Sequence, residues 1–140
     1  MKKVCVVTGG ALGIGKCIVE TFAKNGAAVV FIDFNKEALE NTEKQMRAKG
    51  YEVTGYYGDI AEESVLVEFA DYVLKKYEKI DYLINNACIS KKGILSGCSY
   101  EDFNYVLRIG VSAPYMLAKL FKDKFNKGAS IVNISSTRAF

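Results

Sequence analysis

The chain has 140 residues, half of them hydrophobic and a quarter charged, with a net charge of +3. This length and composition suffice for one globular domain with a sizeable core. The small net charge and the scattered lysines argue against a nucleic-acid surface, and no apolar stretch approaches the length of a membrane span.

The first fifteen residues carry the most informative pattern. Val4–Val7 is a short apolar run typical of a buried strand, and a glycine turn with the spacing Gly9-x-x-x-Gly13-x-Gly15 follows it. Apolar residues then recur at helical spacing. A strand, a glycine turn and a helix together offer backbone N–H groups to a phosphate, although a tight connection without a ligand would give the same pattern.

A second apolar strand ends in an acidic residue. Ala28–Ile32 is followed by Asp33, which lies eighteen residues beyond Gly15. In dinucleotide-binding folds a carboxylate near this position meets the adenosine ribose. The acid therefore favours a dinucleotide site over a bare turn.

Strands and helices alternate along the rest of the chain. The pattern predicts strands at Val4–Thr8, Ala28–Asp33, Glu52–Tyr57, Tyr82–Asn85 and Ser130–Ser135, and helices at Gly13–Asn25, Lys36–Lys49, Glu62–Tyr77 and Tyr100–Asn126. In the last helix, Ser99 and Asp102 can form a capping box. Pro114 should kink that helix and leave the Gly110 carbonyl without its usual partner.

Short apolar strands joined by helices predict an α/β fold with a doubly wound parallel sheet, the Rossmann arrangement, in strand order 3-2-1-4-5. Such a sheet binds its ligand across the carboxyl ends of the strands, at the switch between the first and the fourth. We find no repeats or linkers, so residues 1–140 are expected to form one dinucleotide-binding domain.

The histidine and cysteine content limits which catalytic mechanisms and metal sites the chain can have. The chain has no histidine, which excludes a Ser-His-Asp or Cys-His mechanism within it. No C-x-x-C pair occurs among the four cysteines, so neither a zinc site nor a disulfide framework is indicated. We expect Cys5 and Cys17 to be small core residues. This usage favours a reducing cytoplasm, and the early first strand leaves no room for a signal peptide.

Five motifs occur in the order and rough spacing of one enzyme family. They are Thr8-Gly9-x-x-x-Gly13-Ile14-Gly15, Asp33, Asp59-Ile60, Asn85-Asn86-Ala87 and Ile131-Val132-Asn133-Ile134-Ser135-Ser136. Together they cover the whole chain, which resembles the short-chain dehydrogenase/reductase family. The resemblance implies an oxidoreductase that transfers a hydride between a nicotinamide and a carbonyl or alcohol.

The resemblance also implies a cofactor site, made of Gly9, Leu12, Gly13, Ile14, Gly15, Asp33, Phe34, Asp59, Ile60, Asn85, Asn86 and Ala87. Asp33 should accept hydrogen bonds from both ribose hydroxyls of NAD and repel the extra phosphate of NADP. NADP-preferring relatives often have a basic residue where this chain has Leu12 or Phe34, so NAD is the expected cofactor. Asp59 would meet the adenine amino group, although aspartate is also common in turns.

Ser136 aligns with the catalytic serine of the family, with Ser135 as the alternative. The chain departs from the family at Cys88, which replaces a glycine, and at Gly110, which replaces an asparagine. The carbonyl of that asparagine is thought to hold a proton-relay water, and a free Gly110 carbonyl would keep this role. The family's Tyr-x-x-x-Lys pair should lie roughly a dozen residues beyond this serine, which is past Phe140. We therefore expect no dehydrogenase turnover from this chain alone.

Two further expectations concern partners and alternatives. Because the usual strands beyond Ile131–Ile134 are missing, that strand should be an open apolar edge, and we expect a homo-oligomer or a self-associating chain. The expected ligands are NAD and an unidentified small alcohol or carbonyl, with no nucleic acid, membrane or metal.

The alternative function is a non-catalytic nucleotide-binding or scaffold module, which the missing Tyr-x-x-x-Lys pair would favour. A methyltransferase-like site has no support beyond the glycine turn.

Overall fold

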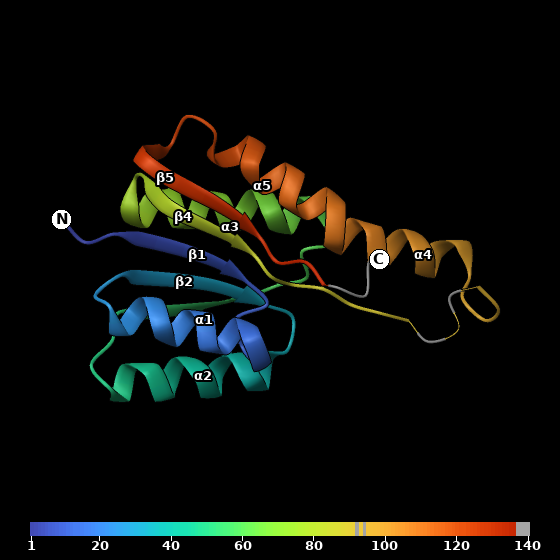
Figure 1. Ribbon diagram of the computed structural model, residues 1–140, viewed down its shortest axis with the longest axis horizontal. Coiled ribbons are helices and arrows are strands. Elements are labelled where there is room, and N and C mark those ends of the chain that lie inside the picture. The colour runs from blue at the N-terminus through green and yellow to red at the C-terminus, as the bar shows by residue number, and fades with distance from the viewer. Residues whose placement is uncertain (92, 94, 137–140) are drawn as a thin grey trace.

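The computed structural model describes residues 1–91, 93 and 95–136, and they form a parallel sheet covered by helices (Figure 1). The strands are β1 (Val4–Thr8), β2 (Ala28–Asp33), β3 (Val53–Tyr57), β4 (Ile80–Asn85) and β5 (Phe125–Asn133). The helices are α1 (Gly13–Lys24), α2 (Lys36–Ala48), α3 (Glu63–Tyr77), α4 (Tyr100–Leu107), the π-helical η1 (Arg108–Ser112) and α5 (Ala113–Phe121).

The sheet has the predicted topology. Its order is β3-β2-β1-β4-β5 and all neighbouring strands are parallel, which confirms the doubly wound α/β fold. Helices α1 and α2 lie on one side of the sheet, and α3 and α5 on the other (Figure 1). Alternate strand residues pack into the two resulting cores: Val6 and Ile32 on the α3 and α5 side, Cys5 and Phe31 on the other. Both faces of the inner strands β1, β2 and β4 are therefore largely buried, as is typical of a parallel sheet covered by helices.

The prediction of one helix from Tyr100 to Asn126 is wrong. The capping box between Ser99 and Asp102 is present, but the helix becomes π-helical at Arg108–Ser112 and α5 ends at Phe121. Pro114 has no N–H to donate, and the turn before it widens so that the N–H of Ala113 donates to the carbonyl of Arg108. The kink expected at Pro114 thus takes the form of a π-helical turn.

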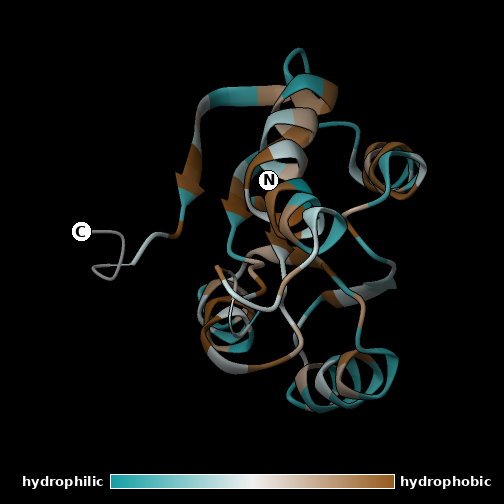
Figure 2. Cartoon of the chain, turned by 90° about the vertical axis from the view of Figure 1, so that its right-hand side faces the viewer, coloured by the Kyte–Doolittle hydropathy of each residue, from teal (hydrophilic) through white to brown (hydrophobic). Residues whose placement is uncertain are grey.

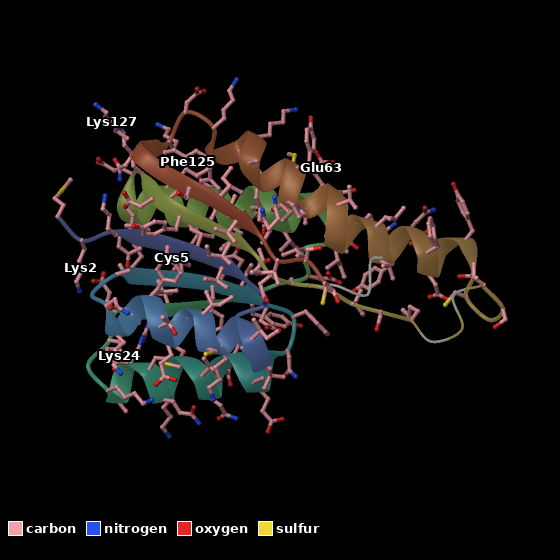
Figure 3. All side chains as sticks on the ribbon, in the orientation of Figure 1. Lys2, Cys5, Lys24, Glu63, Phe125 and Lys127 are labelled. Carbon is pink, nitrogen blue, oxygen red and sulfur yellow. The ribbon has the colours of Figure 1, made fainter. Side chains whose placement is uncertain are left out.

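The predicted strand Ser130–Ser135 begins too late and ends too late, since β5 runs from Phe125 to Asn133. The ring of Phe125 packs edge-on against Phe121, with 6.5 Å between centroids, where β5 begins beside α5 (Figure 3). The N–H of Ile80 also donates to the carbonyl of Lys124. These tertiary contacts extend the strand through a polar segment, Asn126–Ser130, that lacks the apolar pattern of a buried strand.

The carboxyl half of β5 is apolar and open. Ile131 and Val132 are 44% and 42% exposed, and Ile134, just past the end of the strand, is 42% exposed. Figure 2 shows this half of β5 in brown on the outer side of the sheet. An outer strand presents unpaired backbone groups, and apolar side chains beside them make it a template for another chain.

We expect the 140-residue chain to self-associate through this strand. Its mass, measured by size-exclusion chromatography with light scattering, should rise with concentration, and Val132→Lys should lower the association because a charge at an edge opposes strand pairing. The matched control is Val67→Lys on α3, since Val67 is 43% exposed but lies away from the edge. A monodisperse wild-type monomer at high concentration would contradict this expectation.

The two cysteine predictions have different outcomes. Cys5 is buried within the sheet (Figure 3), and burial raises the pKa of its thiol. Cys17 is exposed, so its assignment to the core is wrong. The buried face of α1 consists of Gly15, Val19 and Ala23, which are spaced by one helical turn, and Cys17 lies between the first two on the opposite side.

The described residues form neither a membrane-spanning helix nor a cluster of metal-binding side chains. Among the helices formed by residues 1–91, 93 and 95–136, none is both long and apolar enough to cross a membrane. Within the same residues, no three Cys, Asp or Glu side chains gather into a group that could hold a metal ion.

Candidate cofactor site

A cleft of about 340 Å³ opens where β1, β2, β3 and β4 end. It lies at the switch between β1 and β4, from which the strand order runs in opposite directions. Its volume falls in the usual range for small-molecule sites. Its walls are formed by Gly9, Leu12, Ile14, Gly15, Ile32, Asp33, Phe34, Asn35, Gly58, Asp59, Ile60, Asn86, Ala87, Cys88, Ile89 and Ile109.

The glycine turn on one side of the cleft leaves no room for a side chain at Gly9 or Gly15. Gly9 has a φ of 68°, and its N–H donates to the carbonyl of Ile32 at 2.8 Å. A Cβ on Gly15 would lie 1.8 Å from the carbonyl oxygen of Gly9. Helix α1 starts within this turn without a side-chain cap or an acidic residue in its first turn. The first N–H groups of α1 are therefore available to an anion.

Thr8 and Asn86 tie this turn to the end of β4. The Thr8 hydroxyl accepts hydrogen bonds from the N–H groups of Asn86 and Ala87, at 3.1 and 3.0 Å. The side-chain amide of Asn86 donates to the carbonyls of Thr8 and Gly9, both at 3.1 Å. The two strand ends on either side of the switch point are thus held together, and Asn86 shapes the turn from outside it.

Asp33 is held by two backbone groups, one of which belongs to the glycine turn. One carboxylate oxygen accepts from the N–H of Ala11 and the other from the N–H of Asn35, both at 3.0 Å. Asp33 is half-buried at the end of β2 and lines the cleft. Each carboxylate oxygen keeps a further lone pair. Asp33 can therefore still accept a hydrogen bond from a ligand hydroxyl, and its carboxylate already has a fixed orientation.

Three large apolar side chains stand at the mouth of the cleft. Leu12, Ile14 and Phe34 are 59%, 68% and 60% exposed and all line it. Scattered exposed apolar residues are ordinary on a protein surface, but a group around one concave site marks a place where a ligand covers them.

Asp59, after β3, is held by two groups. Its Oδ1 accepts from the N–H of Ala61 at 2.9 Å, and its Oδ2 accepts from the hydroxyl of Tyr105 on α4 at 2.7 Å. The hydrogen bond to Asp59, then burial, raises the pKa of Tyr105 to about 12. The phenol therefore keeps its proton and remains a donor at neutral pH.

Of the twelve cofactor residues predicted from the sequence, all but Gly13 and Asn85 line the cleft. Asn85 instead joins β4 to β5: its side-chain amide donates to Oδ1 of Asn133 at 2.8 Å, and its carbonyl accepts from the N–H of Ile134. Ser136 is exposed beyond the end of β5 and is not among the cleft residues. Its catalytic role stays a prediction.

Sequence reasoning missed six cleft residues. Cys88 was considered only as a departure from the family pattern, and Ile32, Asn35, Gly58 and Ile89 lie within two residues of a motif position, so proximity to the motifs could have found them. Ile109 comes from η1, far along the chain. Tyr105 is also outside every motif, and it meets Asp59 only because the folded chain brings α4 beside the segment that follows β3.

Comparison with known proteins decides the family. The family model for short chain dehydrogenases matches residues 3–140. The chain belongs to the short chain dehydrogenase family. This confirms the resemblance read from the motifs, and the fold described above is the Rossmann portion of that oxidoreductase family.

Individual relatives agree with the assignment. An uncharacterized oxidoreductase of Thermotoga maritima is 34% identical over 140 residues, which cover 99% of this chain and 55% of that protein. A metagenomic short-chain oxidoreductase in complex with NADP superposes with a TM-score of 0.90 at 31% identity, covering 96% of this chain and 62% of that one. A short chain dehydrogenase from Burkholderia phymatum in complex with NAD gives the same TM-score and identity, covering 96% and 49%.

Two facts bear on what the family assignment says about this chain. It spans about half the length of the relatives it matches. Its structural neighbours include one complex with NADP and one with NAD, so family membership alone does not distinguish between the two cofactors.

Proposed function

We propose that this short chain dehydrogenase binds NAD in the cleft and serves hydride transfer between the nicotinamide and a small alcohol or carbonyl substrate. The observation that carries the choice of NAD is Asp33, whose carboxylate is fixed at the cleft wall by the N–H groups of Ala11 and Asn35. A carboxylate accepts hydrogen bonds from two ribose hydroxyls and repels a phosphate in their place.

The other cleft residues fit the remaining parts of such a dinucleotide. The close-packed turn of Gly9 and Gly15 lets the backbone approach a pyrophosphate, and the uncapped start of α1 supplies N–H groups and partial positive charge. Asp59 and Ile60 would meet the adenine. The exposed side chains at the cleft mouth offer apolar surface for a ligand to cover.

When bound, the nicotinamide supplies the hydride chemistry. The residues of this chain bind and orient it: Asn86 and Thr8 hold the glycine turn in place, and Ala87 lies on the cleft wall at the end of β4. We assign to Ser136 the role of holding the substrate oxygen, and to the Gly110 carbonyl the role of holding a proton-relay water. Thiols at Cys5, Cys17 and Cys88 favour a reducing, cytoplasmic setting.

The cofactor preference is testable by titration calorimetry. NAD should bind more tightly than NADP, and Asp33→Ala should weaken NAD binding by about 1–3 kcal/mol, or about 5- to 150-fold, because a charged acceptor is lost. NADP should be affected less, since the variant also removes the repulsion of its phosphate. The matched control is Glu37→Ala, which removes an exposed acid from the first turn of α2 without touching the cleft.

A second variant tests the same assignment by gain. The double variant Asp33→Ala/Phe34→Arg removes the carboxylate and places a guanidinium at the neighbouring position. Its preference should shift towards NADP, because arginine pairs with phosphate. Equal affinities of the wild-type chain for NAD and NADP, or a preference for NADP, would remove the basis for the Asp33 assignment.

A further inference from the structure

Asp59 differs from Asp33 in the groups that donate hydrogen bonds to its carboxylate. Asp33 is held by two backbone N–H groups, whereas Asp59 has one backbone donor, Ala61, and one side-chain donor, Tyr105. A backbone donor survives any substitution except proline. The hydroxyl of Tyr105, in contrast, is supplied by a single side chain from a distant helix.

Tyr105 is itself held in place on several sides. It is half-buried against the core between the sheet and α3, and the Arg108 guanidinium and Lys91 ammonium lie 5.7 and 5.8 Å from its ring centroid. Arg108 is paired with Glu101 at 2.7 Å. Such cation–π contacts restrict the ring, so the hydroxyl is aimed at Asp59 before any ligand arrives.

We propose that Tyr105 is a positioning residue for adenine: by holding the Asp59 carboxylate in one orientation, it gives this cleft its preference for a purine with a 6-amino group. This inference rests on the proposed dinucleotide site. A carboxylate free to rotate loses orientational freedom when it accepts from a ligand amino group, whereas one already held by Ala61 and Tyr105 does not. Each held oxygen retains a lone pair for that acceptance.

The test compares two dinucleotides by titration calorimetry on the 140-residue chain: NAD, and nicotinamide hypoxanthine dinucleotide, in which an oxo group replaces the 6-amino group. The wild-type chain should favour NAD. Tyr105→Phe removes only the hydroxyl and should weaken NAD binding by about three- to tenfold. It should change the affinity for the hypoxanthine analogue by less than about twofold, because that analogue has no 6-amino group to donate.

Two further variants separate positioning from a general structural role. Tyr100→Phe removes a hydroxyl from the same helix at a residue that is 82% exposed, and it should leave both affinities unchanged. Asp59→Ala should reduce the preference for NAD by itself, and adding Tyr105→Phe to it should have no further effect on that preference. Thermal melts of each variant establish that it is folded.

The outcomes are distinguishable. Absence of NAD binding by the wild-type chain would reject the proposed function itself. If the wild type binds NAD, equal loss of both dinucleotides in Tyr105→Phe would show a structural role and overturn the inference. Tighter NAD binding by that variant would also overturn it, because the hydroxyl would then be competing with adenine for Asp59.

Discussion

Replacing Gly15 by alanine is expected to abolish measurable dinucleotide binding and to lower the free energy of unfolding by about 2–3 kcal/mol. The new methyl group would lie 1.8 Å from the carbonyl oxygen of Gly9 and 2.5 Å from the side-chain amide nitrogen of Asn86. Neither neighbour can move alone, because Asn86 is hydrogen-bonded to that same carbonyl. The glycine turn would have to open, and the backbone groups that face the ligand would move with it.

The measurement is titration calorimetry with NAD together with thermal unfolding. Gly110→Ala is the matched control: a Cβ there would meet nothing within 4 Å, and alanine is favoured over glycine in a helix by about 0.5–1 kcal/mol. That control should bind NAD normally and be at least as stable as the wild type. Normal NAD binding by Gly15→Ala would show that the turn does not form the cofactor contact.

The second large effect is expected at the opposite end of the sheet, at Asp81. This residue is 2% exposed and accepts hydrogen bonds from the N–H of Val4 at 2.8 Å, from Asn126 at 3.2 Å and from Lys3 at 3.3 Å. It therefore joins the starts of β1, β4 and β5. Asp81→Ala should cost about 2–3 kcal/mol, because the buried Val4 N–H loses its acceptor. The melting temperature should fall by roughly 6–12 °C.

Asp81 also gives a pH dependence whose sign can be stated. Burial opposes its ionisation, but the hydrogen bonds from Val4, Lys3 and Asn126 outweigh burial and lower the pKa of Asp81. A carboxyl whose pKa is lower in the folded state stabilises the fold above its ordinary pKa of about 3.9. This stabilisation is lost as the pH falls through the folded-state pKa. The stability difference between wild type and Asp81→Asn should therefore shrink below about pH 4.

Asp71→Ala provides the comparison for Asp81. Asp71 pairs with Lys75 on the surface of α3, where its side chain is 59% exposed. Removing such a pair should change the free energy of unfolding by less than about 0.5 kcal/mol. If Asp81→Ala proved as mild as Asp71→Ala in chemical denaturation, Asp81 would not be the link between the three strands.

The strands of the sheet could be predicted because each one follows from a short pattern in its own part of the sequence. The apolar runs Val4–Val7 and Ala28–Ile32 are too short for helices and follow the strand pattern, and alternation of strands with helices leaves the doubly wound sheet as the natural arrangement. One error falls where a contact distant in sequence decides, and the other falls where Pro114 changes the geometry of its own helix. Asn126–Ser130 joins β5 because it lies beside β4, and Arg108–Ser112 becomes π-helical because Pro114 follows it.

For the candidate site, motifs in the sequence that resemble those of the family indicated the glycine turn, Asp33, Asp59 and Asn86. The strand pattern placed each of them at or just after the carboxyl end of a predicted strand, and parallel strands bring those ends to one edge, where all of them line the cleft. Only the tertiary structure decided what each side chain does there. In the folded chain, Asn85 donates a hydrogen bond to Asn133 of β5, and Asn86 donates one to the Gly9 carbonyl of the glycine turn. Tyr105 donates one to Asp59. The physical reason is that strand position follows from local pattern, whereas side-chain partners depend on how helices pack across the sheet.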